Sequence, residues 1–104
     1  MQNSKRYKVI VDRQVTELLQ SHVRFLAQVS PEAADDLIDD VMAAINSLEI
    51  MPERCSWLND EMLPANKYRK RIFSKRYALI FLIKENTVYV DYILDCRQEY
   101  PWLL

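Results

Sequence analysis

The chain has 104 residues, a formal net charge of −1 and a composition that is half hydrophobic, which predicts a single globular domain spanning residues 1–104. It contains no glycine, which excludes the glycine-rich loops that bind dinucleotides or nucleoside triphosphates and the nucleophile elbow of hydrolases. The single histidine, His22, cannot form a multi-histidine zinc site. We therefore expect neither a metal nor a cofactor.

Nothing in the sequence indicates export or membrane insertion. No apolar run approaches the ~20 residues needed to cross a bilayer, and the start, MQNSKRYKVIV, does not have the pattern of a signal peptide. We expect a cytoplasmic protein in which Cys55 and Cys96 are free thiols rather than a disulfide or metal ligands.

The first half of the chain predicts one strand and two helices. Residues 7–12, YKVIVD, are rich in β-branched residues, which is typical of a strand. Residues 14–28 place six side chains, all of them apolar except His22, on one helical stripe: Val15, Leu18, Leu19, His22, Phe25 and Leu26. A second helix begins after the N-cap Ser30 with Pro31 and is expected to end at Pro52. Its stripe consists of Ala34, Leu37, Ile38, Val41, Ile45 and Leu48, and its acidic residues, which predict a solvated face, are Asp35, Asp36, Asp39 and Asp40.

The second half predicts a connector and three strands. In residues 53–65 we expect Trp57 and Leu58 to pack against the core. The strands are expected at 67–74, 76–84 and 87–95, with the last two joined as a hairpin by the short turn KENT. The resulting fold class is α+β, in the order β-α-α-β-β-β, with two helices packed on one face of a mainly antiparallel sheet.

Positive charge is concentrated in residues 66–77, NKYRKRIFSKRY, which hold six of the fourteen Lys and Arg residues. Residues 1–65 have a net charge of −5 and residues 66–104 a net charge of +4. Alternation along a strand places Lys67, Arg69 and Arg71 on one face, which is the open face if Tyr68 and Ile72 contact the helices. Such a row of cations predicts either an anion-binding face or an edge strand protected from aggregation by its charge.

The C-terminal segment DCRQEYPWLL offers a second basic and aromatic pair. Arg97 follows the last predicted strand directly, and Tyr100 lies three residues further on. The pair could hold a phosphate and stack a base. Alternatively, Arg97 forms an ion pair with Asp95 or Glu99 while Tyr100 covers the core.

Several segments in combination resemble the RelE/ParE superfamily of type II toxins. These are the β-α-α-β-β-β order, the helix SPEAADDLIDDVMAAINSLEIMPER, the stretch YRKRIFSKRYALIFLI, and VYVDYILDCRQEY with its Arg directly after the last strand. The resemblance covers nearly the whole chain. It implies a growth-arresting toxin that a cognate antitoxin neutralises.

The resemblance implies two alternative activities. RelE-like members cleave mRNA on the ribosome, and for that reaction the matching catalytic residues are Arg71, Arg97 and Tyr100. The residues expected to bind RNA or the antitoxin are Lys67, Arg69, Lys75 and Arg76. ParE-like members inhibit DNA gyrase without being enzymes, and the SPEAA helix resembles that branch. A non-toxic relic that only binds antitoxin is the third alternative.

Overall fold

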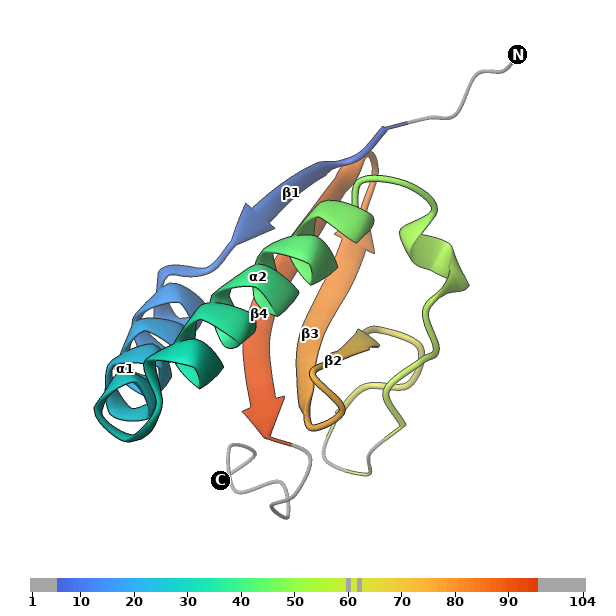
Figure 1. The fold of residues 1–104 in the computed structure, drawn as a ribbon. Helices are drawn as coiled ribbons and strands as arrows, with labels where there is room; N and C mark the ends of the chain where they lie inside the picture. Colours follow the sequence, from blue (N-terminus) through green and yellow to red (C-terminus); the bar gives the residue numbers. More distant parts are fainter. Residues whose placement is uncertain (1–5, 60, 62, 96–104) are drawn as a thin grey trace.

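The computed structural model describes residues 6–59, 61 and 63–95 (Figure 1). Two long helices lie side by side across a four-stranded sheet, which confirms the α+β class and the predicted order. The elements are β1 (Lys8–Val11), α1 (Arg13–Val29), α2 (Pro31–Ser47), a short 3-10 helix (Pro52–Arg54), β2 (Arg69–Phe73), β3 (Tyr77–Lys84) and β4 (Thr87–Asp95). Among these residues no helix is long and apolar enough to span a bilayer.

The sheet has the strand order β1-β4-β3-β2. β1 pairs in parallel with the first half of β4, whereas β2, β3 and β4 are antiparallel. β3 is therefore interior to the sheet, as its continuous apolar sequence predicts, and its residues 77–81 are all buried. The register between β3 and β4 shifts after Ile80, and this bulge places Asp91 opposite no residue of β3.

Both helices begin at the capping residues that their sequences supply. The Asp12 carboxylate accepts a hydrogen bond from the Gln14 amide at 2.8 Å, and the Ser30 hydroxyl accepts one from the Ala33 amide at 3.2 Å. Each bond satisfies an amide that the first helical turn leaves unpaired. α2 ends at Ser47 rather than continuing to Pro52, because Pro52 begins the separate 3-10 helix.

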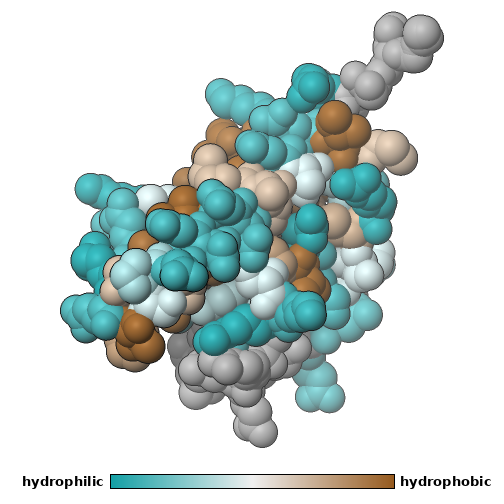
Figure 2. All heavy atoms as spheres, in the orientation of Figure 1, coloured by the Kyte–Doolittle hydropathy of each residue, from teal (hydrophilic) through white to brown (hydrophobic). Residues whose placement is uncertain are grey.

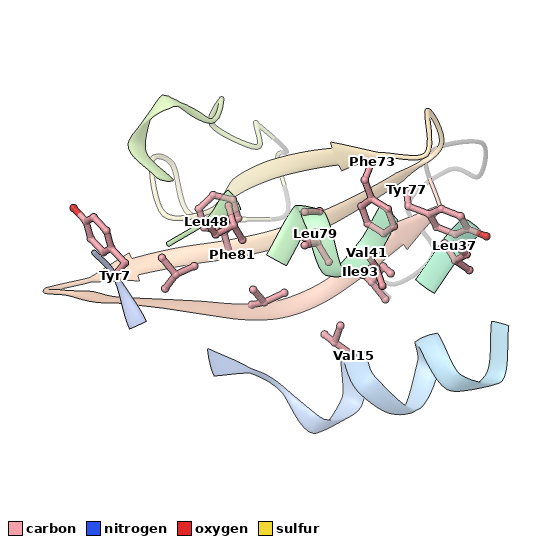
Figure 3. Close-up of a cluster of buried hydrophobic side chains, with 13 residues drawn as sticks. Tyr7, Val15, Leu37, Val41, Leu48, Phe73, Tyr77, Leu79, Phe81 and Ile93 are labelled. Atoms are coloured by element: carbon pink, nitrogen blue, oxygen red, sulfur yellow. The ribbon is translucent and has the colours of Figure 1, made fainter. Parts of the chain in front are cut away.

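The main core lies between the helices and the sheet (Figure 3). Leu79, Phe81 and Val90 of the central strands have no solvent exposure or nearly none and pack beneath Val15 of α1 and Val41 of α2. The predicted stripes are only partly correct, because three of their residues are exposed: Leu18, Phe25 and Ile38. One edge of each stripe is therefore partly exposed to solvent and lies outside the buried core.

A second hydrophobic cluster lies on the opposite face of the sheet. It contains Leu58 of the connector, Tyr68, Ala78, Ile80 and Leu94. The connector pairs with β2 through the Leu58 amide and the Tyr68 carbonyl at 2.8 Å, and through the Lys70 amide and the Ser56 carbonyl at 3.0 Å. This segment therefore covers part of the face that the helices leave open.

Without glycine, the tight turns use other residues in the left-handed region. Positive φ angles occur at Met51, Asn66, Ser74, Lys75 and Glu85. Ser74 and Lys75, with φ of 53° and 62°, are the central residues of the turn between β2 and β3, in which the Arg76 amide donates to the Phe73 carbonyl at 3.3 Å. Consecutive positive φ angles are those of a type I′ hairpin turn, which favours asparagine and glycine. The hydroxyl of Ser74 donates to the Asp40 carboxylate at 2.5 Å, which ties this turn to α2.

Candidate functional site

The basic strand β2 faces the opposite way to the sequence prediction. Arg69 and Arg71 pair with Phe81 and Leu79 of β3, and both of these partners belong to the helix-side core. Arg69 and Arg71 therefore lie on the helix side, and the prediction that they line the open face is wrong. The apolar residue that marks the helix side is Phe73.

Tyr68 and Ile72, the residues predicted to contact the helices, lie on the other face. Tyr68 is only 8% exposed because it packs in the connector-side cluster, and Ile72 is 42% exposed. The alternation itself is as predicted, but both faces carry an apolar residue. The sequence alone therefore does not specify which face meets the helices.

Arg69 fastens the connector to the sheet. Its Nη1 donates to the carbonyl of Glu53 at 2.9 Å and to that of Cys55 at 2.7 Å. Its guanidinium also lies 3.7 Å from the centroid of the Trp57 ring, close enough for a cation–π contact. Trp57 is 37% exposed, so it does not pack fully against the core as predicted, whereas Leu58 does.

Arg71 reaches the C-terminal end of α2. Its Nε donates to the Ser47 hydroxyl at 3.1 Å, and its Nη1 donates to the Ile72 carbonyl. Burial raises the pKa of the Cys55 thiol, and the positive charges of Arg71, Arg54 and Arg69 partly oppose the increase. Cys55 is a free cysteine, as expected, and is half-buried.

Lys67 is separated from these arginines. Its Nζ lies 5.3 Å from the centroid of the Tyr68 ring, on the connector side of the sheet. There the Tyr68 hydroxyl donates to the Asp91 carboxylate at 3.3 Å. Burial, and then Asp91, raise the pKa of Tyr68 to about 12. Burial also raises the pKa of Asp91, against the opposing effects of the Tyr68 hydrogen bond and Lys67.

The remaining predicted cations lie at the turn between β2 and β3. Lys75 is exposed. Arg76 donates to the Asp95 carboxylate at 2.6 Å and lies over the Tyr77 ring at 4.7 Å, so its charge is already paired. Arg97 and Tyr100 lie outside the described residues, as does Cys96. The described structure therefore divides the predicted basic site over two faces and one turn.

Three apolar side chains of α1 are exposed. Leu18 is 45% exposed, Phe25 66% and Val29 72%. Figure 2 shows a small hydrophobic patch at the lower left, where α1 is followed by α2 in Figure 1, with hydrophilic residues around it. With the intervening His22, whose ring lies 5.9 Å from that of Tyr77, these exposed residues of α1 alternate at spacings of four and three. That spacing is typical of a helix that packs against another helix. Beside Leu18 a groove of about 550 Å³ separates α1 from Asp91, Tyr92 and Ile93 of β4.

Comparison with known proteins assigns the family. The model of the ParE toxin of the type II toxin–antitoxin system, parDE, matches residues 9–100. The chain belongs to the ParE toxin family. A solved structure described as the chromosomal ParDE toxin–antitoxin system of P. aeruginosa contains a chain that is similar to it, with a TM-score of 0.71 and 14% identity over 88% of this chain and 98% of that chain. At that identity the similarity shows the fold alone. No curated protein matches.

Two residues of this ParE-family chain were not predicted to belong to a site. Arg54 ends the 3-10 helix, between the two residues whose carbonyls Arg69 binds, and Trp57 provides the exposed ring above Arg69. The segment MPERCSW contains both residues, but it has no periodicity that would predict which way they point. Their proximity to β2 depends on the pairing of the connector with that strand, which is a non-local contact.

Proposed function

We propose that this ParE-family toxin arrests growth by binding DNA gyrase and blocking its reaction, without being an enzyme itself. Family membership supports the toxin assignment, and the ParE branch of the resemblance supports gyrase as the target. The main alternative is ribosome-dependent cleavage of mRNA. That reaction requires cations that converge on one phosphate and stabilise its additional negative charge.

The orientation of Arg71 is the observation that favours gyrase inhibition over mRNA cleavage. Its guanidinium is directed to Ser47 on the helix side and away from Lys67 and Tyr68. Arg69, on the same side, is fixed to two backbone carbonyls. The described part of the chain therefore assembles no cluster of cations on the open face. This disfavours cleavage of RNA on that face and leaves phosphate binding on the helix side open.

We further propose that the toxin is neutralised by an antitoxin helix that packs along the exposed side of α1. Leu18, Phe25 and Val29 form an apolar row with alternating spacings of seven and four residues, which fits the apolar face of an amphipathic helix. Exposed apolar rows of this kind mark interaction surfaces in soluble proteins. A family whose members are held inactive by a partner protein provides the reason for such a surface.

Expression of the chain from a tightly repressed promoter tests the target. We expect growth arrest with intact reporter mRNA by primer extension, and loss of supercoiling activity when purified toxin is added to gyrase. Discrete ribosome-dependent cuts in the mRNA would instead establish the ribonuclease and make Arg71, Arg97 and Tyr100 the first residues to mutate. No arrest at all would identify a relic that only binds antitoxin.

A further inference from the structure

We propose that the surface formed by Arg54, Trp57, Arg69 and Arg71, called here the arginine–tryptophan surface, binds single-stranded nucleic acid. The guanidinium groups would hold a backbone phosphate, and the indole would stack on an unpaired base. Such binding would be a property of the chain alone and would not depend on gyrase being the target.

The positive charge of these arginines is not compensated by an ion pair. Arg69 and Arg71 lie two residues apart on the helix side of β2, and Arg69 donates to the carbonyls of Glu53 and Cys55, the two residues that flank Arg54. None of the three has an ion pair with a described carboxylate. The two acids nearest in sequence to Arg54 have other hydrogen-bond partners. The Glu49 carboxylate pairs with Arg6 at 2.8 Å, and the Glu53 carboxylate accepts from the Tyr7 hydroxyl. Three neighbouring positive charges that form no ion pair among the described residues favour an anionic ligand.

The three arginines keep several N–H donors that make no hydrogen bond within the described structure. Among the described contacts Arg69 uses only Nη1, Arg71 uses Nε and Nη1, and the side chain of Arg54 uses none. A guanidinium has five N–H donors in a planar fork that matches the oxygens of a phosphate. The arginines can therefore keep their structural bonds and still hold a phosphate.

Trp57 lies beside Arg69 and is partly exposed to solvent. One face of its ring lies 3.7 Å from Arg69, and 37% of the residue is still exposed. The backbone on both sides is fixed by the pairing of Ser56 and Leu58 with β2, so the ring does not have to be ordered when a ligand binds. An exposed, immobilised indole supported by a cation is a platform for a base.

These features together favour nucleic acid over an acidic peptide. A peptide carboxylate would use the arginines but would leave the flat ring without a matching partner. A single strand presents a phosphate and a base in each nucleotide, and both parts of the surface would be occupied. Phosphate and a base are common to DNA and RNA, so the surface is expected to accept either source.

The test is fluorescence anisotropy of labelled oligothymidylate and oligouridylate of about ten nucleotides with the purified chain over a series of salt concentrations. We expect Arg54→Ala and Arg71→Ala each to reduce the log–log salt slope by about 0.7. Trp57→Ala should weaken binding about tenfold with little change in slope. Arg24→Ala, which removes an exposed cation on α1, is the matched control and should leave both quantities unchanged.

Arg54→Ala is the most informative variant. The Arg54 residue is exposed, and its side chain has no hydrogen bond or ion pair among the described contacts, so we expect its removal to leave the fold intact. A preference for one oligonucleotide would identify the source of the ligand and still support the surface. Absence of binding at low salt would overturn the proposal, as would equal losses from Arg24→Ala and Arg54→Ala. Competition by polyglutamate as effective as that by unlabelled oligonucleotide would overturn it in favour of an acidic protein partner. Supercoiling assays on the same variants report on the gyrase proposal separately.

Discussion

Truncation of Phe25 to alanine should weaken antitoxin binding without unfolding the toxin. Phe25 is 66% exposed on α1, so its ring contributes little to the core and alanine is a better helix former. Full burial of a phenylalanine side chain is worth about 1.5–3 kcal/mol. Two thirds of that is still available for binding, which gives about 1–2 kcal/mol.

That free energy corresponds to a Kd about 5- to 30-fold higher, measurable by titration calorimetry of the purified toxin with its antitoxin. The control is Gln20→Ala, which alters an exposed residue of the same helix outside the apolar row. If Phe25→Ala binds the antitoxin as tightly as the wild type, or if Gln20→Ala weakens it equally, the antitoxin does not pack along this side of α1.

Three further predictions concern stability. Lys75→Gly relieves a positive φ of 62° and should stabilise the fold by about 0.5–1 kcal/mol in chemical denaturation, whereas the same change at Lys84, in β3, should destabilise it. The raised pKa of Asp91 means that ionisation is less favourable in the folded state, so stability falls as pH rises through that pKa. Asp91→Asn should therefore be more stable than the wild type at neutral pH, with the gain lost below a pH of about 4. Because the pKa of Tyr68 is raised to about 12, the free energy of unfolding should also fall between a pH of about 10 and 12. Tyr68→Phe should lack this decrease. A decrease of the same size in that variant would show that Tyr68 does not cause it.

The helices and strands could be predicted because their signals are local. Asp12 and Ser30 are followed directly by the amides that they cap, and the strands from Arg69 to Asp95 are separated by polar turns of a few residues. The end of α2 was predicted less well. Pro52 stops a helix from continuing, but it does not determine how far before it the helix has ended.

The candidate site could not be predicted because it depends on which layer covers which face. Tyr68 and Phe73 mark opposite faces of β2, and each packs in its own hydrophobic cluster. The sequence predicts that two helices cover one face of the sheet. It gives no periodic signal for the connector, which covers part of the other face. The prediction that Arg69 and Arg71 share one face is therefore confirmed, whereas the prediction of which face it is proves wrong.

The difference between Arg54 and Arg69 shows how the fold and the proposed nucleic-acid surface are coupled. Arg69 contributes its charge to the surface and also holds the connector through the carbonyls of Glu53 and Cys55. Its removal would take this donor from both carbonyls and remove the cation beside Trp57 at the same time, so loss of binding in Arg69→Ala would have two explanations. Arg54 contributes charge alone. A ligand that binds through the positive charge of this surface should therefore bind Arg54→Ala more weakly than the wild type. A ligand that needs only the folded connector should bind both equally.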